Sequence, residues 1–415
     1  MSEKVYIHSV GMIKFGKYLD KSIKNLTGEV LESIKNDNNL SLREIEAAWF
    51  SNAAWGMYEF QHSIRGQVAL SANKIDKIPI INVENACASG STAFHGAWTA
   101  IKAGLFDCVL AIGVEKIYQE DRSKMMKGFM TYTDVERTKK LIEQLKLMAE
   151  KEKAKKAKEQ GTEESKEKKG GHSAFMDLYA MAARTHMKEY GTTKRQLAVV
   201  AAKNHNNSTL NPLAQYTFPM NVEEVMNDYE VAYPLTRSMC APVGDGAAAA
   251  ILCSEKFLKE HPVDRAILIR ASIVQSGSWK KDDIAKRASE AAYKMAGLSP
   301  KDINVAEVHD ATAFGEIHQI EQMGFCPIGQ GGPFTESGAT ALDGEIPINT
   351  SGGLISRGHP IGASGLAQIY ELVVQLRGEA GKRQIKDSRL ALAENGGGNI
   401  GFGEAALCVH ILEKI

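Results

Sequence analysis

The sequence has no net charge, few cysteines and no long apolar run. Its 415 residues contain 50 Lys+Arg and 50 Asp+Glu, so the basic excess that marks most nucleic-acid-binding proteins is missing. Six cysteines without a Cys-x-x-Cys pair argue against both a disulfide scaffold and a structural zinc site. We therefore expect reduced thiols, no bound metal and no nucleic-acid partner.

Targeting and membrane signals are also missing from the sequence. No segment approaches the roughly 18 consecutive apolar residues of a membrane span. The N-terminus enters an apolar strand without the longer apolar core of a signal peptide. The last residues, 412–415, form neither a peroxisomal nor an ER address. We expect a cytoplasmic protein that does not bind membranes.

Apolar runs alternate with helical patterns along most of the chain. Strand-like segments at 5–10, 78–83 and 109–114 are separated by helical patterns such as 24–36, which predicts parallel β-α-β units and an α/β fold. At about 150 residues per domain, the length fits two or three domains or one large α/β unit.

Two further features of the sequence indicate how the chain is divided: a pair of similar segments and one charged segment. Segments 244–256 and 401–414 both open an apolar strand and reach Glu-Lys, which suggests duplicated α/β halves. Segment 139–169 is instead dense in Lys and Glu and predicts an inserted surface helix followed by a linker. Its interleaved glutamates cancel the field of its lysines, so we interpret it as a solvated surface.

Cys87 lies in a turn of small residues between an apolar strand and a helical pattern. Small neighbours leave a thiol accessible, and a helix N-terminus favours the thiolate. The free N–H groups of that terminus could also stabilise an oxyanion. A small buried thiol explains Cys87 equally well, and we adopt that interpretation for Cys108, Cys253 and Cys408, which apolar residues flank.

The second candidate is the glycine-rich segment 352–365, which contains His359 and Pro360. Glycines let the backbone approach a ligand closely, while proline stiffens the position of the histidine. A neutral imidazole beside a thiol is what thiolate formation requires. The alternative is an ordinary turn with a surface histidine, which fits the density of glycines less well.

Two more segments follow predicted strands. At His309-Asp310 a catalytic and a structural histidine are equally good interpretations, and Asp310 could orient backbone or an imidazole. Residues 394–401 formally match G-x-G-x-x-G, but too little chain follows for a dinucleotide-binding unit. We interpret them as a loop that supplies N–H donors. Together with the Cys87 turn and the His359 loop, these strand ends predict one site for acyl transfer through a thioester.

Across essentially its whole length the sequence resembles the thiolases, most closely their sterol-carrier-protein-2-type branch. The Cys turn 85–91 and the Gly-His-Pro segment 352–360 carry the resemblance in combination. The supporting segments are 10–16, 113–116, 203–205 with 211–212, 242–247 and 307–310.

The resemblance implies two stacked βαβαβαββ halves in a five-layer arrangement with the Cys helix at the centre. The N-terminal half would comprise residues 1–262, with a loop domain at 121–232 inserted, and the C-terminal half residues 263–415. The loop domain would cover a CoA pocket that includes Ala241 and Pro242. CoA and acyl-CoA would be substrates, and no covalently bound cofactor is implied.

The resemblance also implies roles for individual residues. Cys87, activated by His359, would attack the 3-keto carbonyl of a 3-oxoacyl-CoA. His359, with a water held by His309, would stabilise the enolate of the departing CoA thioester, and free CoA would then take the acyl group. The loop that would form a second oxyanion hole with the Cys87 N–H comprises Gly397, Gly398 and Asn399.

One expected feature is missing. Thiolases usually have a second cysteine for proton transfer, either in a C-terminal Cys-x-Gly or directly after His-Asp. Here residues 393–403 contain no cysteine, and the residue after His-Asp is Ala311. We hypothesise that His309, Glu394 or Cys326 protonates the departing enolate.

The missing cysteine also points to an unusual, bulky or aromatic substrate, such as that of the benzoylsuccinyl-CoA thiolases in this branch. Those enzymes can require a small zinc-containing OB-fold partner subunit, and thiolases form dimers or tetramers. We expect a degradative enzyme of the β-oxidation type. The alternatives are an acetyl-CoA C-acetyltransferase that makes acetoacetyl-CoA, a non-catalytic thiolase-fold subunit of an acyl-CoA-processing complex, and a retro-aldolase of related fold.

Overall fold

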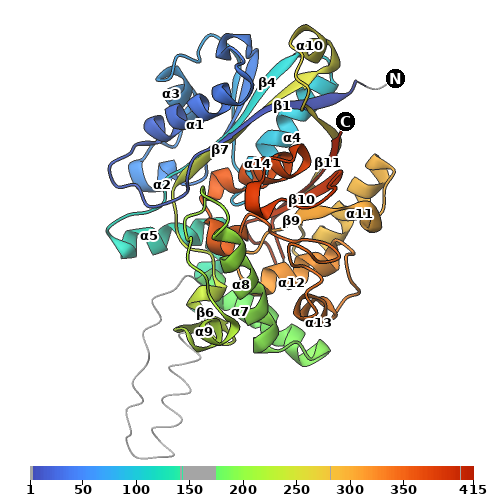
Figure 1. Ribbon diagram of the computed structural model, residues 1–415. Coiled ribbons are helices and arrows are strands. Elements are labelled where there is room, and N and C mark those ends of the chain that lie inside the picture. Colours follow the sequence, from blue (N-terminus) through green and yellow to red (C-terminus); the bar gives the residue numbers. More distant parts are fainter. Residues whose placement is uncertain (1–2, 141–142, 144–173, 281, 402) are drawn as a thin grey trace, which may run out of the picture.

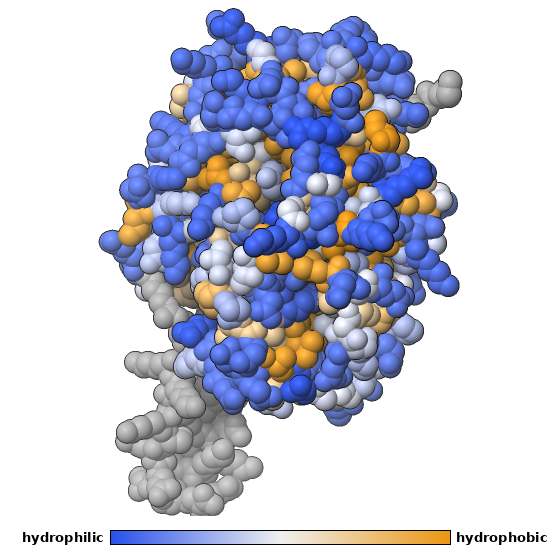
Figure 2. Space-filling view, in the orientation of Figure 1, coloured by the Kyte–Doolittle hydropathy of each residue, from blue (hydrophilic) through white to orange (hydrophobic). Residues whose placement is uncertain are grey.

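The computed structural model describes residues 3–140, 143, 174–280, 282–401 and 403–415, whose helices surround one large sheet (Figure 1). The surface helix and linker predicted at 139–169 lie almost entirely outside these residues. Within the described part of the chain, no helix combines the length and apolar character needed to cross a membrane. The face seen in Figure 2 is largely hydrophilic, with hydrophobic residues in small separate groups.

The strands of the main sheet are β1 (Val5–Met12), β2 (Ala47–Ser51), β3 (Ile80–Val83), β4 (Cys108–Glu115), β7 (Gly246–Ser254), β8 (Ile267–Ser276), β9 (Val305–Glu307), β10 (Leu390–Gly397) and β11 (Ala406–Lys414). A separate two-stranded ribbon comprises β5 (Glu230–Ala232) and β6 (Leu235–Thr236).

The α-helices of the described residues are α1 (Ile23–Asn38), α2 (Trp55–Glu59), α3 (Arg65–Ser71), α4 (Ser89–Lys102), α5 (Arg122–Phe129), α7 (Ala174–Tyr190), α8 (Lys194–Ser208), α9 (Val222–Asn227), α10 (Glu255–Glu260), α11 (Ile284–Ala296), α12 (Ala313–Gln322), α13 (Gly331–Glu336) and α14 (Ser364–Arg377).

The main sheet contains the same strand order twice. Its order is β3-β2-β4-β7-β1-β8-β11-β10-β9, so β8, β9, β10 and β11 repeat the arrangement of β1, β2, β4 and β7. The two halves meet where β1 and β8 pair at only two positions, Tyr6 with Leu268 and Ile7 with Ile267. The segments noted as similar, 244–256 and 401–414, lead into β7 and β11, which occupy equivalent places in the two halves.

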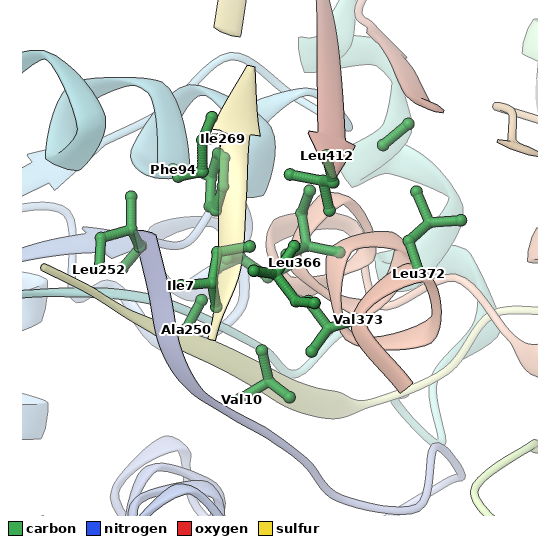
Figure 3. Packing of buried hydrophobic residues seen from close by; sticks show 14 of the residues in the cluster. Ile7, Val10, Phe94, Ala250, Leu252, Ile269, Leu366, Leu372, Val373 and Leu412 are labelled. Atoms are coloured by element: carbon green, nitrogen blue, oxygen red, sulfur yellow. The ribbon is translucent and has the colours of Figure 1, made fainter. Parts of the chain in front are cut away.

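Three apolar clusters show how the layers are stacked. The first lies between the halves of the sheet and is centred on α4 and α14, with Phe94 and Leu366 among its members (Figure 3). The second packs α1 and α3 against the other face of the first half. The third packs α11 and α12 against the second half. The order helix, sheet, helix, sheet, helix confirms the predicted five-layer α/β fold.

Local sequence explains why the first helix forms as predicted. The Ser22 side chain accepts a hydrogen bond from the Asn25 N–H, while the Asn25 side chain accepts one from the Ser22 N–H, which satisfies donors that a helix start leaves free. Leu26, Val30 and Ile34 are buried on one face. The segment predicted as a buried strand at 78–83 differs: β3 is an edge strand, because only β2 pairs with it.

Helices from residues 174–227 cover the site end of the second half. A cluster formed by α7, α8 and α9 packs against Ala313, Phe314 and Ile317 of α12 and against Ile355. Ile355 belongs to the turn Gly353–Arg357, which lies just before His359. Tertiary packing of these helices therefore supports the loop that carries the predicted catalytic histidine.

Candidate active site

Cys87 stands at the start of the central helix α4, in a turn held by hydrogen bonds. The Ser89 hydroxyl donates to the Ala86 carbonyl oxygen at 2.6 Å and accepts from the Asn85 N–H at 2.7 Å. Ala86 adopts a left-handed φ of 48°, which is unusual for a residue with a Cβ. This turn presents the thiol to a cavity at the amino end of α4.

His359 reaches the same point from the loop that precedes the other central helix, α14. Its Nε2 lies 3.2 Å from the Cys87 Sγ, and its Nδ1 lies 2.7 Å from the Ser364 Oγ. The Ser364 hydroxyl donates its one proton to the Pro360 carbonyl oxygen, so it must accept from Nδ1–H. Nε2 is therefore unprotonated and faces the thiol as a base, so the structure brings together the two side chains that the sequence singled out.

Burial sets the charge of this pair. It raises the pKa of the Cys87 thiol to about 12, against the opposing effect of hydrogen bonds from the backbone of Gly398 and of Cys87 itself. Burial also lowers the pKa of His359 well below its ordinary value, with His309 and Arg357 adding to the effect. The Cys87 side chain is only partly exposed and lies on the cavity wall. The preference for a thiolate predicted from the helix end is thus outweighed, and the resting pair is uncharged.

His309 completes a group of three side chains. It follows β9, and its ring centroid lies 5.3 Å from that of His359. The Cys87 sulfur and one ring nitrogen of each histidine lie within 4.8 Å of one another. Burial lowers the pKa of His309 to about 4. A trio this close has the spacing of a metal site, but the thiol and imidazole are hydrogen-bonded to each other, and we interpret the group as acid–base machinery.

Two buried carboxyl groups hold the loop that carries His359. Asp310 accepts the Leu354 N–H at 2.6 Å and an Asn204 amide N–H at 2.8 Å, which fixes the turn before the histidine. Glu115 accepts N–H groups from Ala53, Ala54 and Gly362 at 2.9 to 3.1 Å. Asp310 thus orients backbone, as predicted for it, whereas sequence reasoning quoted Glu115 only as part of a motif.

The glycine loop is only partly arranged as predicted. Gly397 and Gly398 line the cavity, and Gly398 donates to the Cys87 sulfur. The Asn399 N–H is instead bonded to the Tyr132 carbonyl oxygen at 2.9 Å, and Asn399 lines a separate, smaller cavity. Among the candidate donors Gly397 to Asn399, the N–H of Gly398 is the one that reaches Cys87, while that of Asn399 is taken up by β-type pairing.

The three proposed proton donors lie in different places. His309 faces the thiol. Glu394 is buried behind it, where its Oε2 accepts the His309 backbone N–H at 2.8 Å and burial raises its pKa well above the ordinary value. Cys326 packs in the outer apolar cluster with Ile320 and Met323, and burial raises its pKa to about 12. The structure brings neither Glu394 nor Cys326 to the cavity wall, because each belongs to the outer face of the second half.

A cavity of ≈ 850 Å³ opens in front of the three side chains. Ala241 and Pro242, the predicted CoA-binding residues, lie on its wall together with two cations, Lys17 and Arg237. Large apolar side chains dominate another part, and they include Phe129, Tyr132, Tyr179, Tyr216, Phe218 and Met220. No periodic pattern in the sequence marks this wall, because its members come from separate segments.

Sequence reasoning also missed one cysteine. Cys240 lines the cavity beside Ala241, and its thiol donates to the Thr236 carbonyl oxygen at 3.4 Å. The Cys240 backbone forms an isolated antiparallel β-bridge with that of Thr312, three residues after His309. Cys108, Cys253 and Cys408 are buried, as predicted. The cavity therefore contains a second thiol, although that thiol occupies neither of the positions where a second cysteine was sought.

Comparisons with known proteins point to the same family along most of the chain. The family model described as the thiolase N-terminal domain matches residues 5–232, and that described as thiolase C-terminal domain-like matches residues 269–413. The acetyl-CoA acetyltransferase of Methanothermobacter thermautotrophicus is 37% identical over 99% of both chains. Bovine sterol carrier protein 2 is 35% identical over 98% of this chain and 72% of its own length.

Other similar proteins include an enzyme subunit and two solved structures. Benzoylsuccinyl-CoA thiolase subunit BbsB of Thauera aromatica is 32% identical over 96% of both chains. The structure of the Ltp2-ChsH2(DUF35) aldolase is similar with a TM-score of 0.76 at 19% identity, over 100% of this chain and 98% of that one. Human mitochondrial 3-ketoacyl-CoA thiolase has a TM-score of 0.69 at 15% identity, over 99% of both chains. These two likenesses concern the fold alone.

Proposed function

The chain belongs to the thiolase family and is an acyltransferase, and from this premise we propose that it cleaves a 3-oxoacyl-CoA with CoA through an acyl-enzyme on Cys87. The observation that carries the proposal is the 3.2 Å contact between the Cys87 Sγ and an unprotonated His359 Nε2. An uncharged pair of this kind forms its nucleophile only when a proton moves to the imidazole.

The first half-reaction balances with His359 as its only base. The Cys87 S–H proton passes to Nε2 while the sulfur bonds to the 3-keto carbon, giving a tetrahedral oxyanion. The bond between C2 and C3 then breaks, which leaves an acyl thioester on Cys87 and the enolate of the departing CoA thioester. The proton on Nε2 returns to C2 of that enolate. In this proposal, hydrogen bonds from His309 and from the backbone of Gly398 stabilise the two oxyanions.

The second half-reaction reverses the proton path. The thiol of free CoA gives its proton to Nε2 as its sulfur attacks the acyl carbonyl, and Cys87 leaves and recovers that proton. One histidine therefore supplies every proton that the two steps require, which explains how cleavage proceeds without the second cysteine that most thiolases use. His309, facing the same space, is the second candidate for returning the proton to carbon.

The cavity supports a bulky or aromatic acyl group. Its volume of ≈ 850 Å³ and its wall of tyrosine and phenylalanine side chains suit a large apolar group. Benzoylsuccinyl-CoA thiolase subunit BbsB, a relative at 32% identity, has an aromatic substrate in its name. On this basis we place the enzyme in a degradative, β-oxidation type of reaction.

A CoA thioester would enter past Ala241 and Pro242. Lys17 and Arg237 are the positive side chains of the cavity wall among the described residues and are suited to the phosphates of CoA. The Arg237 side chain is 75% exposed and pairs with Asp228, so it is free to exchange that partner for an anionic ligand.

The condensing direction is the second candidate. A relative at 37% identity is named acetyl-CoA acetyltransferase, and the same site run backwards would make acetoacetyl-CoA. The aromatic wall favours cleavage of larger substrates. A non-catalytic subunit and a retro-aldolase are disfavoured, since neither needs the hydrogen-bonded Cys87–His359 pair.

Partners are proposed from two observations. One similar structure contains Ltp2 together with ChsH2(DUF35), and the relative BbsB is named as a subunit, which supports a small second subunit, in our view the zinc-containing OB-fold type. The unpaired edge of β3, where Ile81 is 36% exposed, supports a homodimer through strand addition. We place the assembly in the cytoplasm.

The deciding experiment is intact-protein mass spectrometry after mixing with a panel of 3-oxoacyl-CoA thioesters that runs from acetoacetyl-CoA to aryl-substituted chains. We expect an acyl adduct on Cys87 that disappears when CoA is added, with larger chains preferred. Cys87→Ala should give no adduct, and Cys240→Ala should still give one. Adduct formation by acetoacetyl-CoA alone would favour the acetyltransferase, and no adduct with any thioester, with or without a small partner subunit, would sink the proposal.

A further inference from the structure

We propose that Asn395 is a positioning residue that holds His309 with its single ring proton on Nε2, so that His309 donates a hydrogen bond to the thioester oxygen of the substrate. The inference rests on the proposed function, in which His309 stabilises the enolate. It assigns a side-chain role to a residue outside the trio Cys87, His309 and His359, which the sequence placed only within the glycine segment 394–401.

The geometry of the pair fixes the donor. Asn395 is fully buried in β10, and its Nδ2 lies 3.0 Å from the Nδ1 of His309. An amide NH₂ can only donate, so Nδ1 must accept. A neutral imidazole has one proton, and here that proton must be on Nε2. One nitrogen of His309 lies within 4.8 Å of the Cys87 sulfur and of a His359 nitrogen. Because Nδ1 is turned to Asn395, we infer that Nε2–H is the group that faces them, where the substrate would lie.

The orientation of the Asn395 amide follows from what lies behind it. Its Oδ1 and the Ser91 Oγ both lie within 2.7 Å of the point that a Cβ at Gly365 would occupy. Ser91 is in the first turn of α4 and Gly365 in the first turn of α14. The positive ends of two helix dipoles therefore meet at this oxygen. An oxygen is favoured there over an NH₂ group, which leaves the NH₂ for His309.

Within the part of the chain that the structure describes, two buried polar atoms in this arrangement lack a hydrogen-bond partner. Both the Asn395 Oδ1 and the Ser91 Oγ are buried and have no hydrogen-bond partner among the described residues. The two atoms do not bond to each other directly, so one water between them can accept from the Ser91 O–H and donate to the amide oxygen. That bridge would lock the amide against reversal. A side chain at position 365 would fill the same space, which explains the glycine there.

At ordinary pH, the tautomer of His309, rather than its protonation state, determines which group it presents to the substrate. Burial lowers its pKa to about 4, with Arg357 acting in the same direction. The titratable and charged groups around it are Cys87, His359, Arg357 and Glu394. Because the imidazole stays neutral, only its tautomer decides whether Nε2 presents a proton or a lone pair to the substrate.

The Asn395→Asp variant reverses this choice with little change in shape. A carboxylate accepts from Nδ1–H, so neutral His309 would present a lone pair at Nε2, and only its protonated form would donate. The carboxylate also raises the pKa of His309. We expect kcat of Asn395→Asp to fall about tenfold per pH unit as pH rises through that raised pKa, whereas the wild-type kcat stays level between pH 6 and 9.

Gln368→Glu is the matched control. Gln368 is likewise a fully buried amide near β10, where it donates to the Glu394 carbonyl oxygen, and it does not touch His309. Gln368→Glu should share the loss of stability that an added buried acid causes, but its kcat should not fall as pH rises. The proposal would be overturned if kcat of Asn395→Asp did not change with pH, or if kcat of both variants fell with rising pH in the same way.

A second measurement needs no variant at Asn395 and no turnover. Nuclear magnetic resonance of wild-type protein labelled with ¹⁵N-histidine reports which ring nitrogen holds the proton, and the His309→Asn spectrum assigns the signal. We expect the proton on Nε2. A proton on Nδ1 refutes the proposal even if the enzyme is an active thiolase, while a lack of any acyl-enzyme in the wild type would count against the function alone.

Discussion

The Ser364 hydroxyl accepts the Nδ1–H of His359 at 2.7 Å while it donates to the backbone of Pro360. Ser364 is the first residue of α14, so one of the two central helices also determines which nitrogen of His359 is free. The base of the site is therefore oriented by the fold itself and not by a third acidic residue.

Replacing that hydroxyl should weaken catalysis more than stability. In Ser364→Ala the Nδ1–H loses its acceptor and the ring can turn or change tautomer. We expect kcat for acyl-enzyme formation to fall about tenfold, the equivalent of one net hydrogen bond, with the melting temperature nearly unchanged. Ser364→Thr, which keeps the hydroxyl, is the control. Equal loss in both variants would argue that packing, rather than the hydrogen bond, is at work.

The uncharged resting pair predicts a particular pH dependence. The pKa of Cys87 is raised to about 12 and that of His359 is well below its ordinary value. Turnover should therefore be level from neutral to mildly alkaline pH and fall only in acid, where a protonated His359 can no longer accept the thiol proton.

Alkylation of the thiol tests the same point without turnover. The rate of iodoacetamide labelling at Cys87 should rise steadily up to pH 9, because the thiolate remains a minor form throughout. The measurement uses a Cys240→Ala background, since Cys240 lines the same cavity. A rate that levels off near pH 6 would mean that a thiolate already exists at rest.

Glu115 should tolerate no neutral replacement. Its carboxylate accepts three backbone N–H groups and an Asn52 amide N–H, and Gln would turn one acceptor oxygen into a competing NH₂ donor. We expect Glu115→Gln to lower the free energy of unfolding by about 1–3 kcal/mol and to lower kcat, because Gly362 belongs to the His359 loop. Urea unfolding measures the change in the free energy of unfolding, and steady-state kinetics measures the change in kcat. Lys116→Gln, beside it in the chain, should not lower kcat.

Cys326 and His309 should respond differently to substitution. Cys326 packs in the outer cluster, away from the cavity, so Cys326→Ala should leave kcat unchanged and cost only the stability of a small buried side chain. His309→Ala should lower kcat by roughly 10²-fold or more, as expected for a lost oxyanion donor. A large fall in kcat for a stable Cys326→Ala protein would restore Cys326 as a proton donor.

Local patterns were sufficient for much of the fold and for the two main candidate residues of the site. The strand at β1, helix α1 and the turn that carries Cys87 depend on neighbouring residues: apolar alternation, a capping box and a run of small side chains. The Gly-His-Pro segment is likewise recognisable from its own composition. Sequence alone therefore determined the α/β class and the candidates Cys87 and His359, because the causes of these features lie within a few residues of each other along the chain.

Tertiary structure decided what depends on distance and burial. It placed His359 against a thiol 272 residues away in the sequence, set Asn395 behind His309, and moved Cys326 to an outer layer while bringing Cys240 to the cavity. It also reversed the expected charge of Cys87, since desolvation outweighs the helix end. None of these outcomes has a local signal, because hydrogen bonds and desolvation act between atoms that only folding brings together.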